Sequence, residues 1–443
     1  MKFGIFKKIK TTLFFNLLFL LFFKLVSSYE SIELLPYSIS FFHSGILNFT
    51  TDKEVYKVGE NIKLNVYLKN REGNALLDTY LVIDIVKGCK EFYNPEEKNC
   101  PIVLERIINV GSFRPLEEKR LEINIPIPEY FGSDIYRIDM YWITSLAPIT
   151  GIPASYFNPI STSIKIEGNN SYYPIAIIMS TDTRTAGGLS QRGPGIYNKS
   201  SLISIELHIA TFKNFEGKIV YKTCEFDDTY CESGIKKYEN IEEYSISCSE
   251  SYCNYTHYIK PGNKNTAYSV RMELYDNYGR LNSIYRGRYV VLGESAKIMK
   301  VGVKDLEIYP NESYWIRVSL TGPLEPNREI TTIKNVNLRT KIFSYENLIF
   351  ENITKINELK INNLEAVEIK FSSSSKLDNF KICLELEKDG ITLDNYCSSY
   401  VYSTPVTGSR ESKNIYLIFV VLIITFVAII YLIKRIKQIK HKK

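Results

Sequence analysis

The sequence has 443 residues, with 55 Lys and Arg against 49 Asp and Glu and a formal net charge of +6. The excess of positive charge lies at the two ends of the chain. Residues 1–28 contain five Lys, residues 434–443 contain six Lys and Arg, and neither segment has an acidic residue. The remainder has 44 basic and 49 acidic residues, a net charge of −5. We therefore expect no nucleic-acid partner, and we interpret the basic ends as signals of membrane topology.

Residues 1–28 have the anatomy of a secretory signal peptide. A basic start, MKFGIFKKIK, precedes the apolar run LFFNLLFLLFF, and the small residues of LVSS follow, with cleavage expected after Ser28. The apolar run is too short for a membrane span. An uncleaved signal anchor is the alternative, and either form places residues 29–413 outside the cytoplasm.

Residues 51–78, TDKEVYKVGENIKLNVYLKNREGNALLD, alternate like a half-buried strand. One face is apolar and the other polar: Ile62, Leu64, Val66 and Leu68 against Lys63, Asn65, Tyr67 and Lys69. In the next segment, TYLVIDIV, Leu81, Ile83 and Ile85 share a face. The two segments predict the opening of an antiparallel sheet with one wet face and one dry face.

This opening resembles the immunoglobulin-like modules of the alpha-macroglobulin type and related modules of prokaryotic, including archaeal, cell-surface proteins. The shared pattern is Tyr-x-x-Gly-Glu, an alternating strand and a Gly-containing turn, here Tyr56, Gly59, Glu60 and Gly73, within residues 52–85. The reactive Cys-Gly-Glu-Gln sequence of alpha-macroglobulins is absent. The resemblance therefore implies a structural or adhesive module outside a cell, without a protease-trapping role.

Two joints of low hydrophobicity, EGNNSYYP and LGESAKIMK, divide the outer part into three pieces of sandwich size. The predicted domains are 29–168, 169–294 and 295–403. Alternating segments recur in all three, including RLEINIPIP, SLISIELHIA and AVEIKF, and helical periodicity is confined to the two ends. The predicted fold class is all-β, with tandem immunoglobulin-like β-sandwich domains on a single C-terminal transmembrane helix.

Eight cysteines lie in the outer part, and an even count in an exported region predicts disulfides. They are Cys89, Cys100, Cys224, Cys231, Cys248, Cys253, Cys383 and Cys397. They come in four close couples, and short loops close most easily, so we expect each couple to be bonded. Zinc bound by the four middle cysteines is the alternative, although their spacing is wider than that of most zinc ribbons.

The last couple is predicted to lie across one hairpin. Asp389-Gly390 is a strong two-residue hairpin turn. In that register Cys383 would face Tyr396, so a one-residue bulge is needed to place it opposite Cys397.

Six Asn-x-Ser/Thr sequons, all in the outer part, are candidate glycosylation sites. They are Asn48, Asn169, Asn198, Asn254, Asn311 and Asn352.

The C-terminus predicts a membrane anchor. A juxtamembrane linker, 404–413, precedes a predicted transmembrane helix at 414–433, which is uncharged and strongly apolar. The basic tail 434–443 follows this helix. A basic cluster beside a span marks the cytoplasmic side. The predicted localisation is the cell membrane, as a single-pass type I protein with its bulk outside.

Motifs for catalysis are missing from the sequence: it contains no H-E-x-x-H, no G-x-S-x-G and no phosphate-binding G-x-x-x-x-G-K. His208 lies on the polar face of its strand, where we expect solvent exposure. Glu225, Asp227 and Asp228 form an acidic group that we interpret as a solvated loop, with Ca²⁺ as the alternative. We expect no catalytic residue, cofactor or metal site, and we regard loops 145–163 and 180–200 as candidates for recognition.

These patterns favour a cell-surface protein that serves adhesion, envelope structure or the binding of a protein or glycan partner outside the cell. An accessory subunit of a membrane complex for secretion or glycosylation is the alternative. An extracellular hydrolase with a site invisible to motif searches is the third hypothesis.

Overall fold

The structure is a computed structural model, and it describes residues 45–87, 101–144, 160–168, 176–184, 195–211, 214–225, 228–234, 236–323, 330–361, 363–399 and 401–402. These residues are mostly strand, with one short helix, α2 (Asp228–Glu232), so the predicted all-β class is confirmed. Within these ranges, no helix has the length and apolar character needed to cross a bilayer. The predicted signal peptide, linker, span and tail lie outside the described residues.

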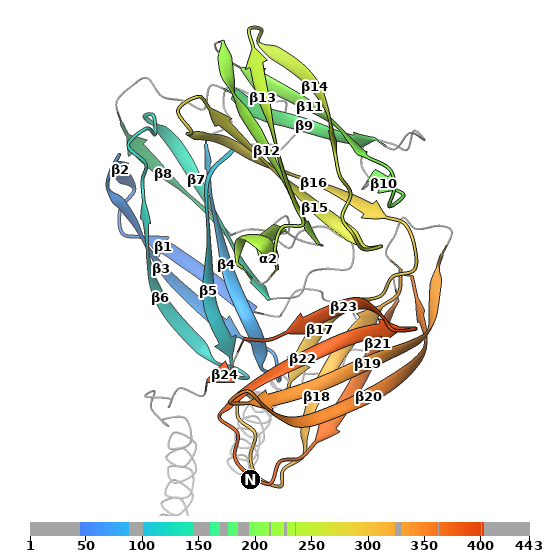
Figure 1. The fold of residues 1–443 in the computed structure, drawn as a ribbon. Helices are drawn as coiled ribbons and strands as arrows, with labels where there is room; N and C mark the ends of the chain where they lie inside the picture. Colours follow the sequence, from blue (N-terminus) through green and yellow to red (C-terminus); the bar gives the residue numbers. More distant parts are fainter. Residues whose placement is uncertain are drawn as a thin grey trace, which may run out of the picture.

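The first β-sandwich contains β1 to β8, drawn in blue and teal in Figure 1. One sheet has the order β1-β3-β6, and the strands of the other follow the order β5-β4-β7-β8-β2. The strands are β1 (Gly45–Thr51), β2 (Val55–Lys57), β3 (Asn61–Asn70), β4 (Leu76–Lys87), β5 (Ile102–Phe113), β6 (Glu118–Pro126), β7 (Asp134–Thr144) and β8 (Ile160–Glu167). The core between the sheets includes the predicted inward residues of β3 and β4.

The wet and dry faces predicted for the opening hold for β3 and are wrong for β4. The predicted outward residues of β3, Lys63, Asn65, Tyr67 and Lys69, are exposed or half-buried, whereas all 12 residues of β4 are buried. The reason is that side chains on the second face of β4 meet the other sandwiches, as Asp84 meets Arg286 and Asp78 meets Tyr396.

The second β-sandwich contains β9 to β16, drawn in green and yellow in Figure 1. Its strands are β9 (Ala176–Arg184), β10 (Gly195–Tyr197), β11 (Ile203–Thr211), β12 (Phe215–Glu225), β13 (Asn240–Cys248), β14 (Tyr252–Ile259), β15 (Ala267–Asp276) and β16 (Leu281–Val291). The sheet β14-β11-β9 packs on the sheet β13-β12-β15-β16. One residue pair, Ile284 with Ile102, joins β16 to β5, so that the first two sandwiches share a ten-stranded sheet.

The third β-sandwich contains β17 to β24, drawn in orange and red in Figure 1. Its strands are β17 (Lys297–Val303), β18 (Tyr314–Thr321), β19 (Thr332–Ser344), β20 (Asn347–Lys360), β21 (Leu364–Phe371), β22 (Asn379–Lys388), β23 (Ile391–Cys397) and β24 (Val401–Tyr402). The sheets are β17-β18-β21 and β20-β19-β22-β23, with β24 beside β22. Its core also includes Ala75 and Leu77 of the first sandwich.

The hairpin of β22 and β23 has the bulge that the sequence analysis requires. Asp389 and Gly390 form the turn, and both have positive φ, as a type I′ turn demands. The register then shifts by one residue between Leu386 and Glu387, which places Cys383 opposite Cys397. The two cysteines are disulfide-bonded.

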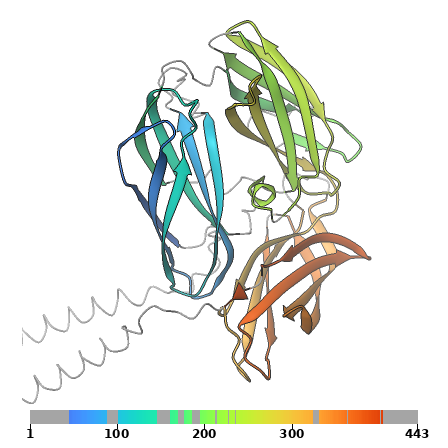
Figure 2. The ribbon, with the colours of Figure 1, turned by 60° about the vertical axis from the view of Figure 1, so that its left-hand side comes forward.

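The three sandwiches lie around α2 and do not form a row, as Figures 1 and 2 both show. The first contacts the third directly, since the Ala75 N–H donates to the Val303 carbonyl at 2.9 Å. Side chains also join the first sandwich to the second and the second to the third, through buried ion pairs. Each sandwich therefore touches the other two.

Candidate functional site

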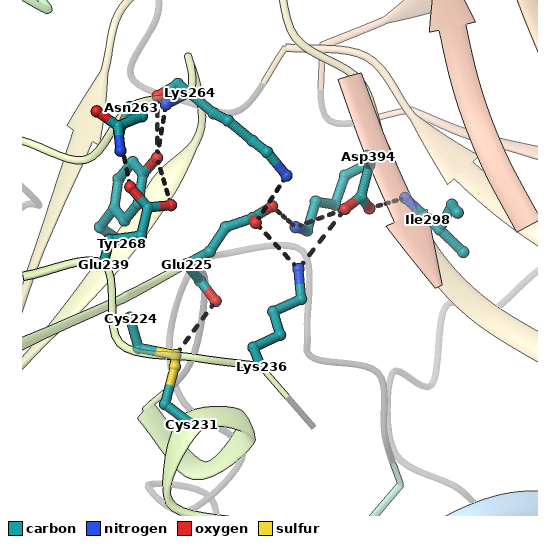
Figure 3. A network of polar contacts seen from close by, with 11 residues as sticks. Cys224, Glu225, Cys231, Lys236, Glu239, Asn263, Lys264, Tyr268, Ile298 and Asp394 are labelled. Carbon is teal, nitrogen blue, oxygen red and sulfur yellow. Dashed lines mark hydrogen bonds and ion pairs between the residues drawn. A yellow bond between two sulfur atoms is a disulfide. The ribbon is translucent and has the colours of Figure 1, made fainter. Parts of the chain in front are cut away.

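Five charged side chains meet where the second and third sandwiches join, and we call them the Glu225 cluster: Glu225, Lys236, Lys264, Lys297 and Asp394. Glu225 ends β12, Lys297 begins β17, and Asp394 lies on β23. The Glu225 carboxylate accepts from the Nζ atoms of Lys297 at 2.8 Å and Lys264 at 3.0 Å. Figure 3 shows Lys236 reaching the Glu225 and Asp394 carboxylates from the side of α2, at 3.2 and 3.7 Å.

Local covalent and backbone contacts hold this cluster in place. The Cys224–Cys231 disulfide ties the end of β12 to α2, directly beside Glu225. The backbone N–H of Ile298 donates to Asp394 Oδ2 at 2.9 Å, while Asp394 Oδ1 accepts from Lys297 at 3.2 Å. Both oxygens of Asp394 are therefore engaged, and the Asp394 side chain is only 3% exposed.

Burial and charge act against each other in the Glu225 cluster. Burial alone would raise the pKa of Glu225, but the ammonium groups of Lys297, Lys236 and Lys264 hold it well below its usual range. Burial would lower the pKa of Lys297, and the carboxylates of Asp394 and Glu225 instead raise it. Burial, and then repulsion by Lys297, lowers the pKa of Lys236. The buried charges persist because each has a partner of opposite sign.

A second group, the Glu105 cluster, joins the first two sandwiches: Asp84, Glu105, Arg271, Glu273 and Arg286. The Glu105 carboxylate accepts from the guanidinium groups of both Arg271 and Arg286. Arg271 Nε also donates to Glu273 at 2.5 Å, and Arg286 lies 3.9 Å from Asp84. All five side chains are at most 5% exposed, so two arginines and three carboxylates share a dry interface.

The first and third sandwiches meet through smaller contacts. Asp78 Oδ2 accepts from the Tyr396 hydroxyl at 3.2 Å and from the Ser399 N–H at 2.9 Å. Arg114 donates to Glu307 at 2.6 Å, and this carboxylate also accepts from the Tyr309 hydroxyl at 2.5 Å. The Tyr309 hydrogen bond, supported by the Arg114 guanidinium and the Lys376 ammonium, lowers the pKa of Glu307 to about 2 against the opposing effect of burial.

The charged side chains of these clusters are paired with one another across the contacts between the sandwiches. Their carboxylates face cations or backbone and hydroxyl donors, and within the described residues no group of His, Cys, Asp and Glu could hold a metal ion. Buried ion pairs contribute little net stability compared with apolar packing, but losing one partner leaves a costly buried charge. Such clusters therefore favour one relative placement of the sandwiches over others.

A hollow of about 490 Å³ lies on the sheet β1-β3-β6. It is lined by Asn48, Phe49, Thr50, Asn65, Val66, Tyr67, Arg120, Leu121 and Glu122. In the register of the sheet, Asn48 faces Tyr67, and Tyr67 faces Arg120. The candidate sequon at Asn48 thus borders an aromatic ring on an exposed sheet face.

The other candidate glycosylation sites differ in accessibility. Asn198, Asn254 and Asn311 are exposed like Asn48, whereas Asn352 is half-buried. Asn169 lies outside the described residues.

The two histidines within the described residues, His208 and His257, have structural neighbours. His208 lies on the outer face of its sheet, as expected, but it is half-buried rather than fully exposed, with Nδ1 2.7 Å from Asn254 Oδ1. His257 stacks on Tyr244 with ring centroids 4.3 Å apart, and its Nδ1 lies 2.7 Å from the Tyr221 hydroxyl. Burial lowers the pKa of His257, which fits a neutral ring packed at the rim of the second sandwich.

Three of the expected disulfides are present: Cys224–Cys231, Cys248–Cys253 and Cys383–Cys397. Zinc binding by the four middle cysteines, the alternative, is wrong because these thiols are bonded in pairs. Cys89 and Cys100 lie outside the described residues.

The charge clusters are what sequence reasoning missed. Glu225 was expected in a solvated acidic loop, and instead it is buried among lysines; Asp227 lies outside the described residues. Arg271 and Glu273 alternate with apolar residues in AYSVRMELYD, and that pattern is the same as in a strand with a wet face. A charged residue at such a position carries no local sign that another domain will cover it.

No family model matches the chain, and no curated protein matches it. Among solved structures, it is similar to alpha-2-macroglobulin from Escherichia coli, with 9% identity over 84% of this chain and 24% of that chain at a TM-score of 0.34. For Salmonella alpha-2-macroglobulin reacted with methylamine, the identity is 11% over 81% and 23% of the two chains, at 0.31.

A CARDB domain from Pyrococcus furiosus is also similar, with 15% identity over 29% of this chain and 98% of that domain, at a TM-score of 0.18. This chain thus spans about a quarter of the alpha-2-macroglobulin chains, 24% and 23% in the two cases. At these TM-scores, the similarities carry no argument about what the chain binds or does.

Proposed function

We propose that the chain is a single-pass cell-surface protein whose three sandwiches form one rigid outer body that presents a binding or structural surface. The observation that carries the proposal is the set of buried charge clusters between the sandwiches. An adhesive or envelope module transmits position and force, which a fixed arrangement of domains serves better than free linkers do.

The rigid body is supported at each of its three contacts. The Glu225 cluster joins the second and third sandwiches, the Glu105 cluster joins the first and second, and Asp78 joins the first to the third. A closed set of three contacts restricts rotation more than two contacts in a row. The Cys224–Cys231 disulfide links β12 to α2 within the second sandwich and so restrains the backbone beside Glu225.

The proposed location in the cell membrane rests on the sequence. The apolar segment 414–433 is followed by the basic tail 434–443, and residues 1–28 resemble a signal peptide. The partner would be a protein or a glycan outside the cell. The hollow beside Asn48 is one surface available to it, whereas most of the candidate recognition loops, 145–159 and 185–194, lies outside the described residues.

Two measurements separately test the surface location and the rigid arrangement of the sandwiches. Protease added to intact cells should digest the bulk of the chain and leave a small fragment that carries residues 434–443. Full protection of the large segment would overturn the surface location and leave the rigid body unaffected.

Rigidity is tested by the distance distribution between spin labels on unnatural amino acids at Lys218 and Lys370. Both side chains are well exposed, on the second and third sandwiches. We expect one narrow distance in the native chain and a broad distribution in Asp394→Ala. Glu118→Ala, which breaks contacts with Lys69 and Tyr67 on the outer face of the first sandwich, is the control and should leave the distribution narrow. A broad distribution in the native chain would overturn the rigid body.

A further inference from the structure

Strand β20 presents a long unpaired edge. It has 14 residues and pairs with β19 on one side, while no strand within the described ranges pairs with its other side. The last residue, Lys360, is engaged by the N–H of Gly322 at 3.1 Å, so the open part is the N-terminal part. An open edge offers a row of backbone donors and acceptors to another strand.

The regular stretch of this edge is short and well defined. The register with β19 shifts between Ile342 and Phe343, which leaves Ile349 as an extra residue on β20. From Phe350 to Ile356 the pairing is then unbroken. The middle residue of this regular stretch is Ile353.

The outward side chains along the edge are unusual for a free surface. Leu348, Ile349 and Ile353 are between 42% and 49% exposed. Natural proteins commonly protect a long edge with charges, Pro or a covering segment, and an apolar open edge tends to associate.

A glycan at Asn352 would not shield this edge easily. Asn352 and Thr354 alternate with the exposed residues and share their face with Phe350 and Ile356, which pack against or within the core. Asn352 is half-buried, and its Nδ2 donates to the Thr354 hydroxyl at 3.0 Å. The sequon thus points to the core side of the sheet.

We infer that two copies of the chain associate through this edge, with β20 pairing antiparallel to β20 of the second copy around Ile353. In this register Ile353 faces its own copy, and Glu351 faces Lys355 of the other copy, twice by symmetry. Directly opposed side chains in antiparallel strands lie close enough for opposite charges to attract. Lys355 is exposed and has no ion-pair partner among the described residues, whereas Glu351 already contacts Arg339.

A second copy is the occupant that this edge favours because the charge pattern is complementary to itself. A two-fold interface requires each patch to match its own copy, and a strand with Glu two residues before its centre and Lys two residues after it meets that condition. The association goes beyond the proposed function and does not depend on the membrane topology.

Cysteine cross-linking of the full-length purified chain tests the register. In Ile353→Cys the two new thiols face each other, within the range that a disulfide needs, so we expect a covalent dimer on mild oxidation. In the matched control Lys355→Cys, the two thiols are four residues apart along the paired strands, about 14 Å, and we expect no cross-link. Equal cross-linking of the two variants would overturn the register.

Charge reversal tests the pairing without adding a thiol. In Lys355→Glu, two attractive pairs become two repulsive ones, and we expect association about tenfold weaker by light scattering of the full-length chain. Lys370→Glu, a reversal of an exposed lysine on β21, is the control and should leave association unchanged. A native chain that remains monomeric across the concentrations tested would overturn the inference, as would a dimer that Lys355→Glu leaves intact. A monomeric native chain would indicate that Lys355 protects the edge of β20 from pairing with another strand.

Discussion

Strands β3 and β4 follow each other in the chain and carry similar apolar alternation, yet their environments differ. In β3, Leu64 and Val66 are buried while Lys63 remains exposed. In β4, every residue is buried, including Asp78 and Asp84. Apolar alternation therefore predicts that one face of a strand is buried. Whether the other face is also buried depends on whether another domain covers it.

The second face of β4 shows the chemical condition for such coverage. A buried carboxylate is tolerated when charged or hydrogen-bonding partners replace the water it loses. Asp84 lies near Arg286 of the second sandwich, and Asp78 accepts hydrogen bonds from Tyr396 and Ser399 of the third. The outer face of β3 needs no such partners because water solvates it.

The largest expected effect comes from removing the acid that two buried arginines share. Glu105→Ala leaves Arg271 and Arg286 in a dry interface without their common partner, and we expect a loss of about 3–5 kcal/mol in the free energy of unfolding. Urea denaturation of the purified chain measures it. Glu118→Ala on the exposed sheet is the control, with an expected loss of at most about 1 kcal/mol. Equal losses of stability in the two variants would show that the buried interface around Glu105 is no more sensitive to the loss of a carboxylate than the exposed sheet around Glu118.

The next effect tests the two faces of β3 itself. Leu64→Ala removes a fully buried side chain, and we expect about 2–4 kcal/mol of destabilisation by the same denaturation assay. Lys63→Ala, the adjacent outward residue, should change stability by no more than about 0.5 kcal/mol. A larger effect at Lys63 would mean that β3 is covered on both sides, as β4 is.

The hairpin of β22 and β23 extends the comparison to the third sandwich. Cys383 and Cys397 are 14 residues apart in the chain, and replacing both by Ser should cost about 3 kcal/mol in the chain-entropy account of disulfides. Thermal denaturation of the double variant measures this cost. Peptide mapping of the non-reduced chain checks the pairing, and a Cys383 peptide linked to any other cysteine would contradict it.

The smallest effect concerns the contact of Arg114 in the first sandwich with Glu307 in the third. Because the folded-state pKa of Glu307 is lowered to about 2 from 4.5, its stabilising contribution is complete above pH 4.5 and is lost as the pH falls towards 2. We expect native chain to melt slightly higher than Glu307→Gln at pH 6, with the difference shrinking in acid. A difference that is independent of pH would exclude this titration as its cause.

Local patterns accounted for much of the fold. The alternation in β3 identified its buried residues, because side chains of a strand point to opposite faces with a period of two. The Asp389-Gly390 turn and the spacing of the cysteines together required a bulge in this hairpin, which lies on β23 with Leu393 as the extra residue. Each of these features depends on residues close in the chain, where geometry leaves few choices.

By itself, the sequence determined the all-β class, the inward face of β3 and the three neighbouring cysteine pairs that lie within the described residues. Tertiary structure alone decided which polar residues are buried. Lys297 is 72 residues from Glu225 and 97 residues from Asp394 in the chain, and these three meet only because the second and third sandwiches join. A charge looks the same in a sequence whether water or an opposite charge surrounds it, and the difference arises when domains exclude the water.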